Sequence, residues 1–394
     1  MKVLIVDKMS EKAVKALKDM GAEVTVNAVK AEELPKVLGD TEVLIVRSTK
    51  VSAAAIEAAP ALSLIVRAGA GVNTIDVAAA SKRGIYVANC PGQNTDAVAE
   101  LAIGLLIAAD RRIVNATDDL RAGKWKKSEY GKARGLKDRT LGIVGLGSIG
   151  KAVAKRALGL EMKVIGWSRS LTPQKAEELG IGYCAKIEEL AEKSDAVSVH
   201  VAAAKETNNL VGKDFFARMK KGAILVNTSR GEVVDPAALK AAIAEKGLRV
   251  GLDVFAGEPA GGEAEFADKE LAAAVIGTPH IGASTDQASE AIAAETVRVI
   301  GTYQVSGHPV NTVNIREKSS AIINLVVRHY NRVGVLAGVL DELRNEGVNI
   351  EEMENTIFEG GAAACCTLKL DEKPSDALLG KIGKADNIIK VMLK

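Results

Sequence analysis

The sequence is poor in cysteine and histidine, with only four of each among 394 residues. Cys90, Cys184, Cys365 and Cys366 show neither a C-x-x-C pair nor the spacing of metal ligands, which argues against a disulfide framework and a zinc site. Neighbouring residues of a strand face opposite sides, so Cys365 and Cys366 are not expected to act together. We therefore expect a reducing, cytoplasmic location and no bound metal.

The sequence also lacks long apolar runs and an excess of charge of one sign. No run reaches the ~18 apolar residues of a membrane span, and the apolar run at 3–6 is too short for a signal peptide. The net charge is only +2, so nothing predicts a nucleic-acid or membrane surface. With 47% hydrophobic residues and 37 glycines, the chain is typical of an α/β protein, and its length predicts roughly two to three domains.

A glycine-rich turn between an apolar strand (141–144) and an Ala-rich helix (149–158) is the strongest local motif. In a dinucleotide site the first glycine of G-x-G-x-x-G allows a tight turn, the second admits the pyrophosphate and the third lets helix and strand pack closely. The helix then directs its first N–H groups at the phosphates, and a strand at 163–167 completes a βαβ unit. The residues assigned to the pyrophosphate are Gly145, Gly147, Ser148, Ile149 and Gly150.

The end of that second strand should contact the ribose of the cofactor. NAD sites usually place an acidic residue here to accept from the 2′-OH, whereas this chain has Ser168 and Arg169. Ser168 would not repel a 2′-phosphate, and Arg169 could pair with one. The sequence therefore permits NAD or NADP; alternatively, Arg169 points into water and the pocket accepts either cofactor.

The first 90 residues alternate apolar strands and helices, which predicts a parallel sheet with helices on both faces. Arg47 and Arg67 stand at the carboxyl ends of two of these strands, where open α/β sheets bind ligands. Both could hold an anionic substrate with the glycine loop at Ala68 and Gly69, although either could be a solvated charge. We expect strands at 3–6, 24–26, 43–46, 64–66 and 85–87, and helices at 11–19, 31–38, 52–58 and 75–82.

A turn at 89–95 precedes a long apolar helix, 96–111, which Asn94 or Thr95 could cap. We interpret this turn as the crossing between domains. The basic segment 121–127 that follows is either a solvated loop or a segment whose Lys127 reaches a phosphate in a neighbouring subunit.

Beyond Arg169 the alternation of strands and helices resumes, and the strands end in polar residues that form a candidate catalytic edge. We expect helices at 172–179, 187–193, 215–219, 236–245 and 285–303, and strands at 195–200, 223–227, 249–254 and 274–276. The last helix should pack back on the first domain. Along this edge we assign to the cofactor Val201, Thr228, Ser229, Asp253, Gly282 and Ala283.

Hydride transfer from a secondary alcohol needs a cation for the substrate, a base for the hydroxyl proton and an anion that orients the base. His200 and His280 both end strands, and His280 is the better base because Glu258, on the exit loop of the preceding strand, could bond to its imidazole. A carboxylate partner raises the pKa of a histidine, and a general base works best near the operating pH. Arg230 is the candidate cation; the alternative for His280 is a buried histidine bonded to backbone.

From about residue 319 the rhythm changes to βαββαβ, which predicts a small separate domain joined by a linker at 309–319. Its strands are expected at 321–328, 349–358, 362–370 and 387–393, and its helices at 335–346 and 375–384.

The residues 145–150, 227–231, 252–259 and 278–284 together resemble the signatures of the D-isomer-specific 2-hydroxyacid dehydrogenases. The tail, at 328–336 and 347–350, resembles an ACT regulatory domain. This combination is similar to the family members that oxidise D-3-phosphoglycerate to 3-phosphohydroxypyruvate, the first step of L-serine biosynthesis. The resemblance implies a flavodoxin-like substrate domain (1–94 and 284–312), a Rossmann cofactor domain (95–283) and an ACT domain (319–394).

The resemblance also implies roles for single residues. Arg230 would hold the substrate carboxylate, Glu258 would orient His280, and His280 would be the acid/base. The residues that would hold the substrate phosphate are Arg47, Arg67 and Lys127, the last across a dimer. The chain is expected to form a homodimer or a homotetramer. Residues matching the L-serine site of feedback-inhibited members are His329, Asn331 and Asn349, although Val333 stands where many ACT domains have proline.

Three functions stay open from the sequence. The first is the oxidation of D-3-phosphoglycerate, and the second is an NADPH-dependent glyoxylate or hydroxypyruvate reductase, suggested by Ser168 and Arg169. The third is a non-catalytic nucleotide-sensing protein, because a fold alone does not determine a function. The ACT tail is either an L-serine effector site between two copies or a dimerisation module that binds nothing.

Overall fold

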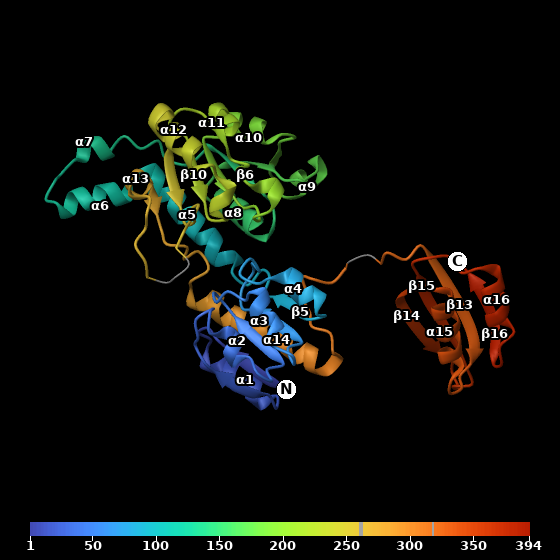
Figure 1. The fold of residues 1–394 in the computed structure, drawn as a ribbon. Helices are drawn as coiled ribbons and strands as arrows, with labels where there is room; N and C mark the ends of the chain where they lie inside the picture. Colours follow the sequence, from blue (N-terminus) through green and yellow to red (C-terminus); the bar gives the residue numbers. More distant parts are fainter. Residues whose placement is uncertain (260–262, 317–318) are drawn as a thin grey trace. The chain divides into compact units, whose positions relative to one another are not determined.

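Three sheets organise the chain. A computed structural model describes residues 1–259, 263–316 and 319–394, in two compact units, Met1–Asn314 and Ile315–Lys394. Two parallel sheets with helices on both faces belong to the first unit, and an antiparallel sheet belongs to the second (Figure 1). The expected fold class, two doubly wound α/β sheets followed by a βαββαβ unit, is confirmed.

The first sheet has five parallel strands in the order β2-β1-β3-β4-β5, which is the flavodoxin-like order. Its strands are almost continuous apolar runs because helices cover both faces. The strands are β1 (Lys2–Ile5), β2 (Glu23–Val26), β3 (Val43–Val46), β4 (Leu64–Arg67) and β5 (Tyr86–Asn89), and the helices are α1 (Glu11–Asp19), α2 (Leu34–Val37), α3 (Ala53–Glu57), α4 (Val77–Lys82) and α14 (Asp286–Ser306).

The long helix α14 returns the chain to this first sheet. Its buried residues Ile292, Val299 and Ile300 join the same core as Val3 and Val66. The expected packing of this helix on the first domain is therefore confirmed.

The second sheet has seven parallel strands in the order β12-β11-β10-β9-β6-β7-β8, with the reversal between β6 and β9. The turn after β6 contains the glycine motif, so the motif lies at the point where ligands bind in such sheets. The strands are β6 (Thr140–Val144), β7 (Lys163–Trp167), β8 (Gly182–Tyr183), β9 (Ala196–Val199), β10 (Ile224–Asn227), β11 (Arg249–Leu252) and β12 (Ile276–Gly277).

Two hydrophobic cores lie on the two faces of this sheet. The helices are α5 (Thr95–Arg111), α8 (Ser148–Gly159), α9 (Pro173–Glu178), α10 (Ile187–Lys193), α11 (Lys213–Arg218), α12 (Pro236–Lys246) and α13 (Lys269–Ala274). The short elements β8 and α13 were not predicted from the sequence.

Two helices that were not predicted follow α5, and residues 122–126 of the basic segment 121–127 lie between them, as expected of a loop. Arg112 adopts a left-handed conformation (φ 51°), and helices α6 (Ile113–Arg121) and α7 (Lys127–Tyr130) follow. Neither helix has a buried residue. Asn94 precedes α5 but makes no side-chain cap, so the expected capping by Asn94 is wrong.

The unit Ile315–Lys394 is an antiparallel sheet in the order β14-β15-β13-β16 with its own core. Its elements are β13 (Ile323–Tyr330), α15 (Val335–Glu346), β14 (Ile350–Ile357), β15 (Ala363–Leu370), α16 (Asp376–Gly383) and β16 (Ile388–Leu393). The elements agree with the expected βαββαβ order.

The expected linker, 309–319, begins too early in the chain. The side chain of Asn314 accepts from Val87 N–H at 2.8 Å, and Thr312 forms a bridge with Ala88. Residues up to Asn314 therefore belong to the first unit, while 317 and 318 lie outside the described residues. Across the described residues, no helix combines the length and the hydrophobicity that a bilayer crossing needs.

Candidate active site

The glycine turn after β6 has the shape of a phosphate-binding cradle. Gly145 adopts φ +95°, and a Cβ there would collide with the carbonyl oxygen of His200. A Cβ on Gly150 would collide with the carbonyl oxygen of Gly145, which explains the close approach of helix and strand. Gly147 has no atom within 4 Å of an added Cβ, so its exposed side is open to a ligand.

Helix α8 begins at Ser148, directly after this turn. Lys151 N–H donates to Gly147 O at 3.0 Å, whereas the N–H groups of the first turn, from Ser148 to Gly150, have no carbonyl four residues before them within the helix. At the end of β10 the hydroxyl of Thr228 is buried without a partner. Open N–H groups and an unpartnered hydroxyl are what the phosphates of a dinucleotide would satisfy, so these residues fit the cofactor.

Ser229, the neighbour of Thr228, is already engaged within the chain. Its hydroxyl donates to Asn227 Oδ1 at 2.7 Å, and its N–H donates to the same oxygen at 3.0 Å. Asn227 thereby shapes the turn that leads from β10 to Arg230, and a cofactor contact of Ser229 stays a prediction.

The loop after β7 has cations and no carboxylate. Ser168 Oγ accepts from Ser170 N–H at 3.4 Å, and Lys175 Nζ donates to Ser170 O at 3.3 Å. Arg169 is exposed. Nothing in the loop would repel a 2′-phosphate.

His280 and Glu258 form the ion pair that the sequence predicts, with Nδ1 and Oε1 2.6 Å apart. This hydrogen bond raises the pKa of His280, although partial burial opposes the effect. The imidazole is exposed and bonded to a carboxylate, so the alternative of a buried histidine bonded to backbone is wrong. The arrangement can accept a proton and stabilise the resulting imidazolium.

The backbone at His280 is unusual because it adopts φ +52°. The buried Asp253 holds this conformation: its carboxylate accepts from Thr278 Oγ1 at 2.7 Å and from the N–H groups of Ile281 and Gly282, each at 2.8 Å. Both oxygens of Asp253 are thus occupied. The visible role of Asp253 is to position the His280 loop, and its predicted cofactor contact is not seen among these bonds.

His200 ends β9 but differs from His280 in its surroundings. Its Nε2 lies 2.7 Å from Ser198 Oγ, and its Nδ1 is buried without a partner. Burial lowers the pKa of His200 to about 3. A histidine without a carboxylate partner is a poorer proton acceptor than His280, which agrees with the choice made from the sequence.

Three arginines approach one another at the carboxyl ends of the two sheets. Arg230 follows β10, and a Cβ on Gly71 of the first sheet's glycine loop would collide with its guanidinium. The side chain of Arg67 folds over Gly69. Burial lowers the pKa of Arg67, and so do the charges of Arg230 and Arg47. Among the described residues, the buried Nε of Arg67 has no hydrogen-bond partner.

Asp7, at the end of β1, was missed by the sequence analysis. Its carboxylate accepts from the N–H groups of Arg47, Ser48 and Thr49 at 2.6, 3.1 and 3.0 Å. The signal was available, because Asp7 ends a strand at the same edge as Arg47 and Arg67. Only the pairing of β1 with β3 shows that the two ends meet.

Lys127 is the first residue of α7, on the segment that follows α6. No described contact joins Lys127 to the three arginines. The phosphate contact of Lys127 in a neighbouring subunit, which the resemblance implies, stays a prediction.

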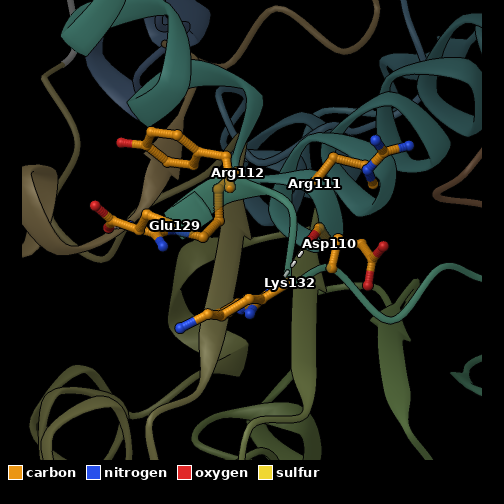
Figure 2. Close-up of a pocket in the computed structure, with 8 residues that line it drawn as sticks. Asp110, Arg111, Arg112, Glu129 and Lys132 are labelled. Carbon is orange, nitrogen blue, oxygen red and sulfur yellow. Dashed lines mark hydrogen bonds and ion pairs between the residues drawn. The ribbon is translucent and has the colours of Figure 1, made fainter. Parts of the chain in front are cut away.

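A cavity of about 260 Å³ lies at the C-terminal end of α5 (Figure 2), and none of the residues assigned above lines it. Arg249 Nη1 donates to Asp110 O at 2.6 Å, and Arg112 pairs with Glu129 at 2.8 Å. Arg249 thus places a positive charge at the carbonyl end of α5, where such a charge is stabilising. The lining residues are Asp110, Arg111, Arg112, Glu129, Tyr130, Lys132, Ala133 and Arg249.

In the second unit, the three residues assigned to an effector do not meet within one chain. His329 is buried, with its ring nitrogens 2.9 Å from Tyr330 O and 3.3 Å from Asn355 Oδ1. The register pairs Tyr330 with Ala363 and Ile350 with Leu370. His329 and Asn331 therefore lie at one end of the sheet, and Asn349 lies at the other.

Comparison with known proteins adds three findings. The model of the "D-isomer specific 2-hydroxyacid dehydrogenase, NAD binding domain" matches residues 103–282. The glyoxylate reductase of Thermococcus litoralis is 44% identical over 67% of this chain and 81% of its own length. The D-3-phosphoglycerate dehydrogenase of Methanocaldococcus jannaschii is 39% identical over 80% of this chain, which spans only 60% of that relative.

Among solved structures, the NAD⁺-bound 3-phosphoglycerate dehydrogenase of Entamoeba histolytica aligns with a TM-score of 0.67 and 30% identity. The alignment covers 80% of this chain and 99% of that one. The glycine cradle and the second sheet thus have the fold of an NAD-binding domain.

Proposed function

Because the chain belongs to the D-isomer-specific 2-hydroxyacid dehydrogenase family, we propose that it oxidises D-3-phosphoglycerate to 3-phosphohydroxypyruvate, the first step of L-serine biosynthesis. The observation that supports this substrate is the gathering of Arg47, Arg67 and Arg230 at one edge. A phosphorylated 2-hydroxy acid has anionic groups at both ends. Its carboxylate and phosphate would pair with these guanidiniums through charge-assisted hydrogen bonds.

Arg230 is proposed to bind the carboxylate and to donate to the oxygen on C2, which polarises that carbon. Arg47 and Arg67 would hold the phosphate, with the backbone of Ala68 and Gly69 closing the site. A substrate held at both ends presents C2 in a fixed orientation, which lowers the entropic part of the barrier.

His280 is proposed to take the hydroxyl proton on its free Nε2 while Nδ1 stays bonded to Glu258. The carboxylate stabilises the imidazolium, and in the reverse direction the same imidazolium returns the proton to the carbonyl oxygen. NAD or NADP, held by the glycine cradle and α8, supplies the hydride acceptor.

The test is the ratio of kcat/KM for 3-phosphohydroxypyruvate to that for hydroxypyruvate, measured with NADH and with NADPH. A strong preference for the phosphorylated acid with either cofactor supports the proposal. Equal values would refute the phosphorylated substrate. Dinucleotide binding without turnover of any 2-oxoacid would favour a nucleotide sensor instead.

The second candidate is an NADPH-dependent reductase of glyoxylate or hydroxypyruvate. Two observations favour it: Ser168 and Arg169 in place of an acidic ribose ligand, and the similarity to a glyoxylate reductase. It predicts no preference for the phosphorylated acid and a preference for NADPH in the same assay.

For residues 319–394 we propose an ACT domain that assembles two or more copies of the chain and binds L-serine between them. The separation of His329 and Asn331 from Asn349 supports a shared site, because a neighbouring sheet could supply the missing end. Calorimetric titration with L-serine tests this proposal. We expect a heat of binding and inhibition of the enzyme. No heat and no inhibition at millimolar L-serine would mean that the domain is a dimerisation module that binds nothing.

A further inference from the structure

We propose that Asp7 is a positioning residue that builds the anion-binding half of the substrate site, and thereby sets the preference for a phosphorylated acid. It would act through the segment Arg47–Thr49 and not by touching the substrate. The inference rests on the function proposed above, because the reaction and the phosphorylated substrate come from there.

The contacts of Asp7 concentrate on a single segment. Oδ2 accepts from the N–H groups of Arg47, Ser48 and Thr49 at 2.6, 3.1 and 3.0 Å. Oδ1 accepts from the hydroxyls of Ser48 and Thr49 at 2.8 and 3.1 Å. A carboxylate offers about four lone-pair positions, so this set of donors saturates it. Asp7 therefore faces the loop, and its hydrogen-bonding capacity is used within the chain.

The position of these contacts in the sheet points to a ligand. In the order β2-β1-β3-β4-β5 the connections reverse direction between β1 and β3. Open α/β sheets bind ligands at the carboxyl ends of the strands on either side of such a reversal. Asp7 follows β1 and Arg47 follows β3, so the hydrogen bonds between them span this point.

The charge of Asp7 also acts on the neighbouring arginine Arg67. Burial raises the pKa of Asp7, but the bonds from Arg47, Thr49 and Ser48 outweigh it and lower the pKa overall. Asp7 is thus more readily ionised than an unperturbed aspartate. Its charge raises the pKa of Arg67, opposing the effects of burial, Arg230 and Arg47. Asp7 therefore offsets part of the repulsion among the arginines before a substrate arrives.

The test is Asp7→Asn in the full-length chain, which keeps the size of the side chain but removes the charge and turns an amide N–H₂ towards the donors. We expect KM for 3-phosphohydroxypyruvate to rise about tenfold, the equivalent of one lost charge-assisted hydrogen bond. We expect kcat and the KM for hydroxypyruvate to stay within about twofold. Inorganic phosphate should also become a weaker inhibitor of hydroxypyruvate reduction.

Two further variants separate positioning from general stability. Ser52→Ala removes the cap of α3, where Ser52 Oγ accepts from Ala55 N–H at 3.3 Å, so it perturbs the same region without reaching Asp7. It should lower the melting temperature slightly and leave both KM values unchanged. In a variant that already carries Arg47→Ala, Asp7→Asn should cause little further rise in KM for 3-phosphohydroxypyruvate, because Asp7 acts through that segment.

Equal rises of both KM values, or a loss confined to kcat, would overturn the inference, as would full additivity with Arg47→Ala. A wild-type enzyme that does not distinguish the two acids refutes the phosphorylated substrate instead. In that case inorganic phosphate alone tests the role of Asp7. The inference stands only if Asp7→Asn weakens the inhibition by inorganic phosphate.

Discussion

At the scale of the residue, the left-handed backbone of His280 decides which substitution tests it best. Asn tolerates φ +52° better than most residues, and it cannot act as a base. We expect His280→Asn to lower kcat by roughly 10²- to 10⁴-fold, with dinucleotide affinity unchanged in a fluorescence titration. Near-normal turnover would show that another group moves the proton.

The hydrogen bond between His280 and Glu258 predicts how the rate of reduction depends on pH. Reduction needs the imidazolium, so kcat/KM should fall as the pH rises through the pKa of His280, which Glu258 holds above the ordinary 6.5. Glu258→Gln removes the anion, so the fall should move to lower pH. A profile that keeps its midpoint in this variant would mean that His280 is not the group that titrates.

Ser168 should control the choice of cofactor. A carboxylate at this position would accept from the ribose 2′-OH of NADH and repel the 2′-phosphate of NADPH. We expect Ser168→Asp to weaken NADPH binding at least tenfold relative to NADH, measured as dissociation constants. Arg169→Ala should weaken NADPH only; equal losses for both cofactors would mean that the loop does not contact the 2′ position.

At the scale of the element, the turn from β6 to α8 contains two glycines with different roles: Gly150 allows close packing, and Gly147 leaves space for a ligand. Gly150→Ala places a methyl group against the carbonyl of Gly145, and such overpacking should cost about 1–3 kcal/mol of stability. Gly147→Ala meets open space, so the melting temperature should stay unchanged while NAD(H) affinity falls. Thermal melting and titration of both variants separate the two effects. The idea fails if Gly147→Ala binds cofactor normally.

The elements also show where periodicity is informative. The apolar strands and the helices they alternate with were predictable, because helices on both faces of a parallel sheet demand almost continuous apolar runs. Helices α6 and α7 were not predicted, and they bury no residue. Helix α6 starts directly after the left-handed turn at Arg112, which no local propensity predicts.

At the scale of the whole molecule, the two units have separate hydrophobic cores. We expect a chain ending at Asn314 to fold, to bind dinucleotide and to keep kcat within about threefold at saturating substrate. Any inhibition by L-serine should be lost. Loss of folding in the shortened chain would show that the second unit stabilises the first.

The sequence by itself determined the sheets, the glycine cradle and the pair of His280 and Glu258. These depend on short-range patterns: runs of apolar residues, the spacing of glycines, and polar residues that end strands. Only the tertiary structure decided which strand ends meet. It joined Asp7 to the loop of Arg47, brought Arg230 against Gly71, and separated His329 from Asn349, because the order and register of strands are set by contacts between segments distant in the chain.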